Sequence, residues 1–446
     1  MDISISKIAD FLSCKIYGND TRVNNIVIDS RKISIGDLFV AIGGSNHDGH
    51  DYIQESINRG ATAILCSDIS RTYGINVPYI VCDNTIAALG IIARNIKKIN
   101  GSPFTIGITG TNGKTSVTKL TSTILTQEFS VSTTVGNYNN DIGLPLSIFQ
   151  SFNENTIHKS VYELGASKKN DIRDLVNICE PDLTTLLNVS EAHMESFGSF
   201  DNLISTKEEI FSHNNTSQVV LNKNDTYYQK WRELNNSKTI TTVSINKEAD
   251  YYISKSDDKY IYLSTSKGDF ELDKRDLTGI LPINLLFSIS LAMEAGASIS
   301  SVQKGVKQFY GVEGRFYSYM SSKNNSLIID DSYNANPESM KSSLHQLGSF
   351  QQNKIFVMGD MGELGEKSLY HHQTIFKLAK DLGVEYLLYM GTYKDEAKST
   401  FGENCVCFED MDELINYVYQ VSDENTVVLI KASRFMNFDL IAKGLK

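Results

Sequence analysis

The chain has 446 residues, of which 41% are hydrophobic and 21% are charged, as in globular proteins with several cores. Asp and Glu outnumber Lys and Arg by 53 to 42, and the resulting formal charge of -11 repels nucleic acid. No apolar run reaches the roughly 18 residues that span a bilayer, and the first residues lack the basic and apolar segments of a signal peptide. We therefore expect a cytoplasmic protein that binds no nucleic acid and does not insert into membranes.

Residues 1–82 have the pattern of a small mixed α/β domain. A helix is expected over Asp51–Asn58, and short apolar strands are expected at Asn25–Ile28, Asp37–Ala41, Ala63–Cys66 and Tyr79–Val81. One polar loop places the hydroxyl of Ser30 beside the guanidinium of Arg31, which suits a diphosphate or a carboxylate. A second loop, residues 46–51, carries two His and two Asp around one Gly. A solvated turn would have the same composition as either loop.

A glycine-rich turn follows, with the sequence Gly107-Ile108-Thr109-Gly110-Thr111-Asn112-Gly113-Lys114-Thr115. It joins a strand predicted at Phe104–Thr109 to a helix predicted at Thr115–Leu125. The glycines let backbone N–H groups face an anion, Lys114 can reach the terminal phosphates of a nucleotide, and the Thr115 hydroxyl can ligate Mg2+. The general phosphate-loop pattern requires Gly where this chain has Ile108, so only its Gly-Lys-Thr core matches. An ordinary turn would not explain Lys-Thr directly behind Gly113, so we predict a nucleoside triphosphate site.

From Asn84 to Gly311 the pattern alternates between strand and helix, as in an open parallel sheet. Two of its strands are expected at Ser160–Leu164 and Leu183–Val189. Because ligands gather at the carboxyl ends of parallel strands, Glu163 and His193 should both face the glycine-rich turn. Glu163 is the stronger candidate for Mg2+, which prefers oxygen ligands, whereas an isolated His193 is more typical of a structural histidine.

Three other stretches of this region have less specific patterns. Asn139 and Asn140 lie in a run rich in Asn and Gly, which is usually a loop. Lys207 lies in a helix predicted at Thr206–Phe211, where its neighbours indicate a solvated lysine paired with carboxylates. The helix predicted at Asn284–Ala295 is apolar on most faces and should be buried.

Residues 312–446 alternate in the same way and predict a Rossmann-like domain that lacks the G-x-G-x-x-G turn. Its helices should begin near Pro337, Lys367, Asp410 and Phe435, and its strands are expected at Ser326–Asp331, Lys354–Met358, Glu385–Met390, Val406–Phe408 and Thr426–Ile430. The predicted fold class is therefore α/β with three domains. They are a small mixed α/β domain at 1–82, a central parallel-sheet domain of the P-loop ATPase type at 83–311, and a Rossmann-like domain at 312–446.

Several motifs, found in this order, give the chain a resemblance to the Mur ligase family over nearly its whole length. They are Asp29-Ser30-Arg31-Lys32, Gly36 to Ala41, Asp48 to Tyr52, Thr109 to Thr115, Glu191-Ala192-His193, Phe197-Gly198-Ser199, Asp331 to Pro337, and Gly359 to Gly365. The glycine-rich turn is shared by all Mur ligases and by folylpolyglutamate synthases. The stretch Tyr333-Asn334-Ala335-Asn336-Pro337 is typical of the branch that adds D-alanyl-D-alanine.

The resemblance implies an ATP-dependent, ADP-forming amide ligase of peptidoglycan precursor synthesis. In this family ATP phosphorylates the terminal carboxylate of a UDP-linked peptide, and an amine then attacks the acyl phosphate. For this branch the acid is UDP-N-acetylmuramoyl-tripeptide, the amine is D-alanyl-D-alanine, and the product is the UDP-N-acetylmuramoyl-pentapeptide. The first domain would bind the UDP-sugar, and the last would bind the amine and close over ATP. ATP and Mg2+ are the implied cofactors, and we expect a monomer.

The resemblance also implies roles for individual residues. The catalytic set would be Lys114, Lys207, Glu163 and His193. Thr115 would ligate a first Mg2+, and Glu163 and His193 would ligate a second metal. Lys207 would be carbamylated by CO2, which replaces its local interpretation as a solvated lysine. ATP would contact Gly110, Thr111, Asn112, Gly113, Lys114, Thr115, Asn284, Arg315, Asp331 and Asn336. The acid and amine substrates would contact Ser30, Arg31, His47, Asn139, Asn140 and Tyr333.

Two departures and two alternatives accompany this resemblance. Many relatives carry a His-Asn pair where this chain has residues 279–284, which leaves Asn284 as the candidate adenine contact, and Lys431-Ala432-Ser433-Arg434 replaces the commoner Lys-Gly-Ser-Arg. One alternative is a ligase of the same architecture for a different acid or amine, although the Ser30 loop and the 46–51 loop favour a UDP-sugar over a folate. The other alternative is a binding or regulatory protein, which would not need all five of Lys114, Thr115, Glu163, His193 and Lys207. The third residue of the peptide, and the choice between D-alanyl-D-alanine and D-alanyl-D-serine, stay open.

Overall fold

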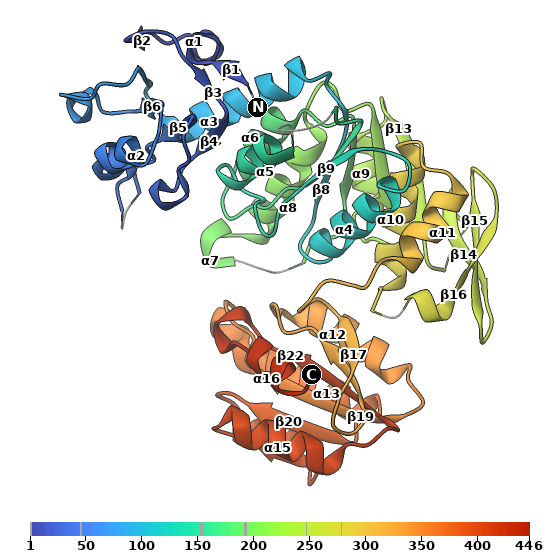
Figure 1. Ribbon diagram of the computed structural model, residues 1–446. Helices are drawn as coiled ribbons and strands as arrows, with labels where there is room; N and C mark the ends of the chain where they lie inside the picture. Colours follow the sequence, from blue (N-terminus) through green and yellow to red (C-terminus); the bar gives the residue numbers. More distant parts are fainter. Residues whose placement is uncertain (1, 45–46, 152–155, 191–193, 247, 278) are drawn as a thin grey trace.

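Each of three regions of the chain builds its own main β-sheet from buried apolar strands. The computed structural model describes residues 2–44, 47–151, 156–190, 194–246, 248–277 and 279–446. Figure 1 shows the three domains, with the N-terminal and C-terminal domains attached to different sides of the central one. The predicted α/β fold with three domains is confirmed.

The N-terminal domain contains a five-stranded sheet in the order β2-β7-β6-β5-β4 and a separate antiparallel pair, β1 with β3. The predicted strands and helix lie within two residues of their predicted limits, whereas α1 was not predicted. The helix α1 begins where the Ser4 side chain accepts a hydrogen bond from the Lys7 N–H. The elements are β1 (Ile3–Ser4), α1 (Ile5–Leu12), β2 (Ile16–Tyr17), β3 (Arg22–Val23), β4 (Asn25–Val27), β5 (Asp37–Val40), α2 (Ile53–Asn58), β6 (Ala63–Cys66) and β7 (Tyr79–Val81).

The central domain contains a nine-stranded sheet in the order β16-β15-β14-β13-β12-β11-β8-β10-β9. Its strands are β8 (Phe104–Thr109), β9 (Val131–Thr133), β10 (Lys159–Glu163), β11 (Leu183–Leu186), β12 (Gln218–Asn222), β13 (Thr239–Ser244), β14 (Tyr251–Ser256), β15 (Tyr260–Thr265) and β16 (Phe270–Asp273). Strands β14, β15 and β16 form an antiparallel extension, visible at the right of Figure 1, that the sequence pattern did not predict. The remaining neighbours in the sheet are parallel, as predicted.

Helices cover both faces of this sheet. They are α3 (Thr85–Ile99), α4 (Lys114–Leu125), α5 (Gly143–Ser151), α6 (Asp171–Cys179), α7 (Met194–Phe197), α8 (Phe200–Glu208), α9 (Tyr228–Leu234), α10 (Pro282–Glu294) and α11 (Ile299–Lys307). Strand β8 lies between β10 and β11 and is buried from Thr105 to Thr109, so the start of the glycine-rich turn is held by two neighbouring strands. The strand and helix predicted on either side of the turn are confirmed, but the strand predicted to reach Val189 ends at Leu186.

The C-terminal domain contains a six-stranded sheet in the order β17-β18-β22-β19-β20-β21, in which β17 is antiparallel to β18. Its strands are β17 (Tyr317–Met320), β18 (Leu327–Asp330), β19 (Asn353–Gly359), β20 (Tyr386–Met390), β21 (Cys405–Cys407) and β22 (Thr426–Lys431). Its helices are α12 (Pro337–Gly348), α13 (Ser368–Asp381), α14 (Lys394–Phe401), α15 (Met411–Val421) and α16 (Asp439–Gly444). The prediction of a helix starting near Phe435 is wrong, because Asn437 adopts a φ of 54° after a single 3-10 turn and α16 begins only at Asp439.

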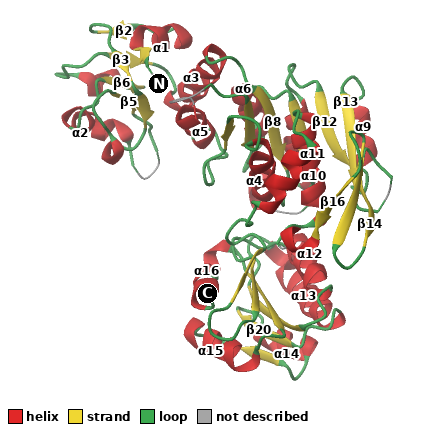
Figure 2. Cartoon of the chain, turned by 45° about the vertical axis from the view of Figure 1, so that its right-hand side comes forward, coloured by secondary structure: helices red, strands yellow, loops and turns green. Residues whose placement is uncertain are grey.

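The central and C-terminal sheets direct their strand ends toward one another. Figure 2 shows the loops that follow the C-terminal strands lying between that sheet and the central domain. The glycine-rich turn, called the phosphate turn below for its predicted role, and the ends of β10 and β11 therefore lie opposite the ends of β18, β19 and β22. Within the described ranges, no helix has both the length and the apolar character needed to cross a membrane.

The helix that begins at the phosphate turn depends on a close approach between two backbones. Gly305 of α11 is so near α4 that a Cβ added to it would lie 2.6 Å from Ile124 Cα. Gly305→Ala should therefore destabilise the protein by about 1–3 kcal/mol, although the same change in an open helix stabilises by about 1 kcal/mol. Thermal unfolding measures this effect. Gly90→Ala is the matched control and should cost less, because its Cβ would meet only the side chain of Ile178; an equal loss for both variants would contradict the prediction.

Candidate functional site

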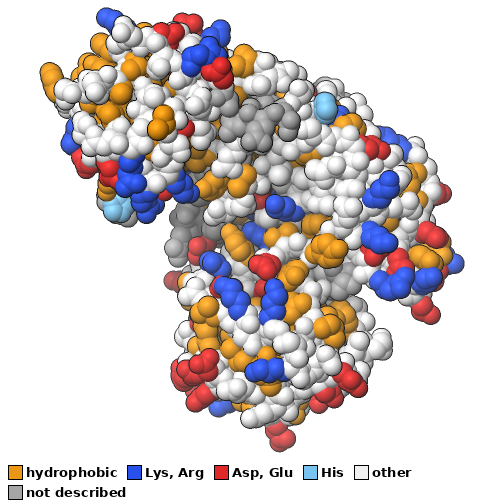
Figure 3. Space-filling view, viewed as in Figure 1, with side chains coloured by type: hydrophobic (Ala, Val, Ile, Leu, Met, Phe, Trp, Pro, Cys, Tyr) orange, Lys and Arg blue, Asp and Glu red, His pale blue; other side chains and the backbone are white. Residues whose placement is uncertain are grey.

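The loops between the central and C-terminal domains line one large cavity of about 1400 Å³. Figure 3 shows the hollow between the two domains, with Lys and Arg side chains gathered on its C-terminal side. Most of the predicted ATP-binding and catalytic residues line it, together with three of the predicted substrate-binding residues, Asn139, Asn140 and Tyr333. They are Gly110, Thr111, Asn112, Gly113, Lys114, Asn139, Asn140, Glu163, Lys207, Asn284, Arg315, Asp331, Tyr333 and Asn336. The topology thus brings together residues that are more than 200 positions apart in the sequence.

The glycine-rich turn is fixed by side chains that follow β11. The N–H groups of Thr111 and Asn112 donate to the backbone oxygen and the side-chain Oδ1 of Asn188, at 3.0 and 2.9 Å. Thr111 also exchanges hydrogen bonds with the backbone of Ser190. Sequence reasoning missed Asn188 and Ser190. Their place directly behind a parallel strand, the same signal that identified Glu163, could have found both.

Gly113 ends the turn with a conformation that only glycine adopts freely. Its φ is 85°, and a Cβ at this position would lie 2.7 Å from Asn284 Oδ1. Asn284, at the start of α10, therefore lies against the phosphate turn itself. Glycine is therefore required at this position both by the backbone conformation and by the contact with Asn284.

Lys114 folds back onto the turn that precedes it. Its Nζ donates to the backbone oxygens of Gly110 and Thr111, both at 2.9 Å. Burial lowers the pKa of Lys114, and the neighbouring Glu163 carboxylate opposes that shift. A ligand with several negative charges would replace the two carbonyl contacts and stabilise the charged form.

Lys207 is buried, contrary to the local sequence interpretation of a solvated lysine. It is 4% exposed, and its Nζ donates to the Gly110 backbone oxygen at 3.0 Å. Burial, followed by the charge of Lys114, moves the pKa of Lys207 well below its usual value. The helix α8 thus places a buried amine, whose charged form is disfavoured by burial and by Lys114, against the backbone of the glycine-rich turn.

Glu163 occupies the end of β10, as predicted, and is 2% exposed. Its Oε2 accepts a 2.6 Å hydrogen bond from the Thr115 hydroxyl, and its Oε1 accepts one of 2.8 Å from the Asn139 amide. Asn140 instead accepts a hydrogen bond from the Gly143 N–H at the start of α5. Glu163 and Thr115 are therefore held together as oxygen donors beside the turn.

The predicted third metal ligand, His193, lies outside the described residues together with Glu191 and Ala192. Across the part of the chain that is described, no three His, Cys, Asp or Glu side chains gather closely enough to hold a metal ion. Even without a third ligand, the oxygen atoms of Glu163 and Thr115 are of the type that Mg2+ binds, since Mg2+ takes oxygen ligands and commonly keeps several waters.

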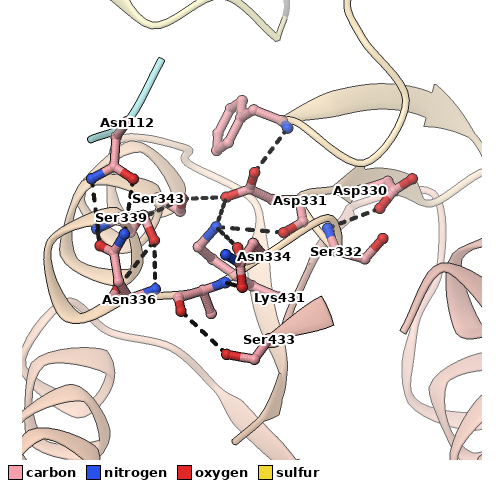
Figure 4. A network of polar contacts seen from close by, with 12 residues as sticks. Asn112, Asp330, Asp331, Ser332, Asn334, Asn336, Ser339, Ser343, Lys431 and Ser433 are labelled. Atoms are coloured by element: carbon pink, nitrogen blue, oxygen red, sulfur yellow. Dashed lines mark hydrogen bonds and ion pairs between the residues drawn. The ribbon is translucent and has the colours of Figure 1, made fainter. Parts of the chain in front are cut away.

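The C-terminal wall of the cavity is held by a buried ion pair. Asp331, which follows β18, pairs with Lys431 at the end of β22, and Lys431 also donates to the Asn334 backbone oxygen (Figure 4). Asp331 further accepts hydrogen bonds from the Ser343 hydroxyl at 2.6 Å and the Phe316 N–H at 3.1 Å. The Asp331 carboxylate thus fixes the loops of this wall.

Asn336 connects the two walls. As the N-cap of α12, its Oδ1 accepts from the Ser339 N–H at 2.9 Å. Its amide Nδ2 donates to Asn112 Oδ1 at 2.9 Å, and Asn112 donates back at 3.4 Å (Figure 4). The tip of the phosphate turn therefore contacts the C-terminal domain directly.

Tyr333 lies between two arginines on the same wall. The guanidinium carbon of Arg315 is 3.9 Å from the centre of its ring, and that of Arg434 is 5.7 Å from it. The Tyr333 N–H donates to the Gly314 oxygen at 2.8 Å, which holds the aromatic ring next to the start of the domain. Arg315 also lies near enough to Lys114 to lower the pKa of that lysine further.

The predicted UDP-binding residues lie elsewhere. Arg31 forms a two-point ion pair with Asp29, with both distances 2.9 Å, and this contact lowers the pKa of Asp29 to about 2. Ser30 is buried and His47 is exposed. Ser30, Arg31 and His47 are all among the described residues, and none of the three lines the large cavity.

Comparisons with known proteins match this architecture along the chain. Three family models match successive regions: "Mur ligase family, catalytic domain" at residues 22–97, "Mur ligase middle domain" at 108–290, and "Mur ligase, glutamate ligase domain" at 314–434. A UDP-N-acetylmuramoyl-tripeptide–D-alanyl-D-alanine ligase from Buchnera aphidicola is 31% identical over 465 residues, covering 100% of this chain and 98% of that protein.

Known structures of similar fold also cover the whole chain. The crystal structure of MurF from Acinetobacter baumannii has a TM-score of 0.88 and 24% identity, covering 100% of this chain and 99% of that one, and it supports the fold alone. The MurF ligase from Thermotoga maritima, crystallised in complex with ADP, has a TM-score of 0.82 and 26% identity, covering 95% and 97%. From its matched regions and its full-length relative, the chain belongs to the Mur ligase family.

Proposed function

We propose that this chain joins D-alanyl-D-alanine to UDP-N-acetylmuramoyl-tripeptide at the expense of ATP, and that it does so as a cytoplasmic monomer. ATP would phosphorylate the terminal carboxylate of the tripeptide and leave as ADP. The dipeptide amine would then attack the acyl phosphate, forming the amide and releasing phosphate. The buried cluster of Lys114, Lys207 and Glu163 at the phosphate turn carries the proposal, and the names of the full-length relatives supply the two substrates.

The phosphate turn would hold the ATP phosphates. Backbone N–H groups of the turn would face them, and Lys114 would leave its two carbonyl partners to neutralise their charge. On the opposite wall, Arg315 and the Asn336 loop line the cavity and would contact the nucleotide, whereas the Asp331 carboxylate is paired with Lys431. Closure of the two domains over ATP would exclude water from the acyl phosphate.

The donor set beside the turn fits a magnesium ion. Thr115 and Glu163 would hold it, with Asn139 orienting the Glu163 carboxylate, and His193 remains a candidate for a second metal. Bound there, Mg2+ would neutralise charge on the transferring phosphoryl group. The protein itself contributes the positions of these oxygens, and burial keeps water from competing for them.

Lys207 would act as a carbamate. A lysine reacts with CO2 through its neutral amine, and burial next to Lys114 favours that form here. The added carboxylate would convert a repulsive contact with Lys114 into an attractive one. It would also place a second anion near Glu163. The metal site would then gain a ligand from α8, a helix whose local sequence did not predict a metal ligand.

The remaining roles follow the three-domain division. Residues 1–82 would bind the UDP group through Ser30, Arg31 and His47, residues 83–311 would bind ATP, and residues 312–446 would bind the amine. Asn139 and Asn140 line the cavity next to Glu163, where the tripeptide carboxylate must lie to be phosphorylated. Tyr333 lies on the opposite wall and would contact the amine.

The direct test is an assay of phosphate release from ATP and Mg2+. Release should require both the tripeptide substrate and D-alanyl-D-alanine, because the amine consumes the acyl phosphate. Mass spectrometry should find a product heavier by the dipeptide minus one water. Tripeptides with different third residues should be tried, with D-alanyl-D-serine as a competing amine. No release by folded, ATP-binding protein with any of these pairs would contradict the proposal and favour a ligase of another acid or amine.

Lys114→Ala should reduce kcat by roughly 100-fold or more, because the terminal phosphates lose their positive partner. The measurement is steady-state phosphate release at saturating substrates. Lys119→Ala is the matched control, since Lys119 is exposed on the same helix and should be dispensable. Nearly normal turnover by Lys114→Ala would remove the basis of the phosphate assignment.

Lys207→Ala should lose activity, and short carboxylic acids such as acetate should partly restore it by supplying the missing anion. Lys207→Arg is the control, because the guanidinium fills the space and cannot be carbamylated, so acetate should not rescue it. Phosphate release is measured across a series of acetate concentrations. Full activity of Lys207→Ala without acetate, or equal rescue of both variants, would rule out a carbamate.

A further inference from the structure

Six cationic side chains line the large cavity, and most of them have partners that assign them to phosphate binding or to the walls. They are Lys114, Lys168, Lys207, Arg315, Lys431 and Arg434. Lys114 and Lys207 both donate to the phosphate turn. Lys431 is neutralised by Asp331, and Arg315 lies against Tyr333 near Lys114. Lys168 belongs to the central wall, so Arg434 is the remaining cation on the C-terminal wall.

Arg434 is only loosely held by its own domain. Its side chain is 60% exposed, and its ion pair with Asp439 is long, at 3.5 Å. Asp439 has a closer cation in Lys443, at 2.9 Å. The guanidinium also lies 5.7 Å from the centre of the Tyr333 ring. Both side chains line the cavity, which leaves room for a ligand beside them. Arg434 therefore keeps most of its hydrogen-bonding capacity for a bound anion.

The backbone that carries Arg434 is rigid, unlike its side chain. Ser433, the preceding residue, accepts a 2.8 Å hydrogen bond from the Gly362 N–H and donates to the Ala335 oxygen at 3.2 Å. The Ser433 N–H donates to the Asp360 oxygen at 2.9 Å. Ser433 thus joins the three loops that follow β18, β19 and β22, and the next residue projects from a fixed point.

Apolar surface of a suitable size lies beside Arg434. Phe435 is 64% exposed and lines the cavity. It lies so close to Gly362 that a Cβ there would be 3.0 Å from its ring. Leu364 lines the cavity nearby. A ligand with small methyl side chains can lie on this surface, whereas a bulky one would have to displace Phe435.

We propose that Arg434 binds the terminal carboxylate of the incoming D-alanyl-dipeptide, an inference that rests on the proposed ligase function. A carboxylate matches the two-point donor geometry of a guanidinium. Two extended residues span about 7 Å, so a dipeptide held there can extend its amine past Tyr333 toward the phosphate turn. Phe435 and Gly362 then limit the space that is available to the methyl groups of the dipeptide. Arg434 is a specificity-determining residue for the amine, and it takes no part in phosphoryl transfer.

The test compares D-alanyl-D-alanine with D-alanyl-D-alaninamide, which has the same shape and amine but no carboxylate. With the wild-type chain, kcat/KM should be roughly 10- to 100-fold higher for the acid, the effect of one lost charged hydrogen-bonded pair. In Arg434→Gln the acid and the amide should become nearly equal. KM values for ATP and the tripeptide should not change. Arg434→Lys should keep an intermediate preference for the acid.

Asp439→Asn is the matched control, because it changes the neighbour of Arg434 and leaves the guanidinium in place, and it should keep the wild-type preference. The proposal is overturned if the wild type does not prefer the acid, if Arg434→Gln keeps the full preference, or if the KM for ATP or for the tripeptide rises instead. Failure of the proposed function looks different, since the wild type would then release no phosphate with either dipeptide.

Discussion

Two buried lysines share one backbone oxygen, that of Gly110, and the site is organised around this contact. Lys114 and Lys207 donate to it at 2.9 and 3.0 Å, with Glu163 as a nearby carboxylate. Two ammonium groups so close in a buried place destabilise each other unless one is neutral or an anion joins them. In the protein alone, the positive charges of the two lysines are therefore not fully balanced by negative charge. A polyanionic ligand, together with a modified lysine, would supply the missing charge.

The loops of the opposite wall are held by a charged pair that is already complete. Asp331 and Lys431 neutralise each other beneath the surface, while Ser433 joins the neighbouring loops through neutral hydrogen bonds. The departure from the commoner motif, Ala432, is fully buried. It fits because Gly359 faces it, where a second Cβ would be only 2.7 Å away.

The strand ends that line the cavity could be predicted from the sequence, because they follow from local patterns. Glu163 ends an apolar strand, and Lys114 follows a turn rich in glycine. Hydrophobic periodicity, and the rule that ligands gather at the carboxyl ends of parallel strands, therefore located both residues. Lys207 could not be found in this way. Its burial depends on Gly110, 97 positions earlier, and its immediate neighbours look solvent-exposed. The antiparallel strands β14 to β16 and the late start of α16 were also missed, since pairing direction and the left-handed Asn437 are set by tertiary contacts.

The amide pair of Asn112 and Asn336 has a consequence for the order in which the chain assembles. These residues are 224 positions apart, and loop closure over such a distance is entropically costly. Two neutral hydrogen bonds return only about 1 kcal/mol each. Each sheet can therefore complete its own core before this pair forms, and the pair can break without unfolding either domain. We therefore expect this contact to form late in folding, and breaking its two hydrogen bonds costs about 2 kcal/mol, a few times thermal energy.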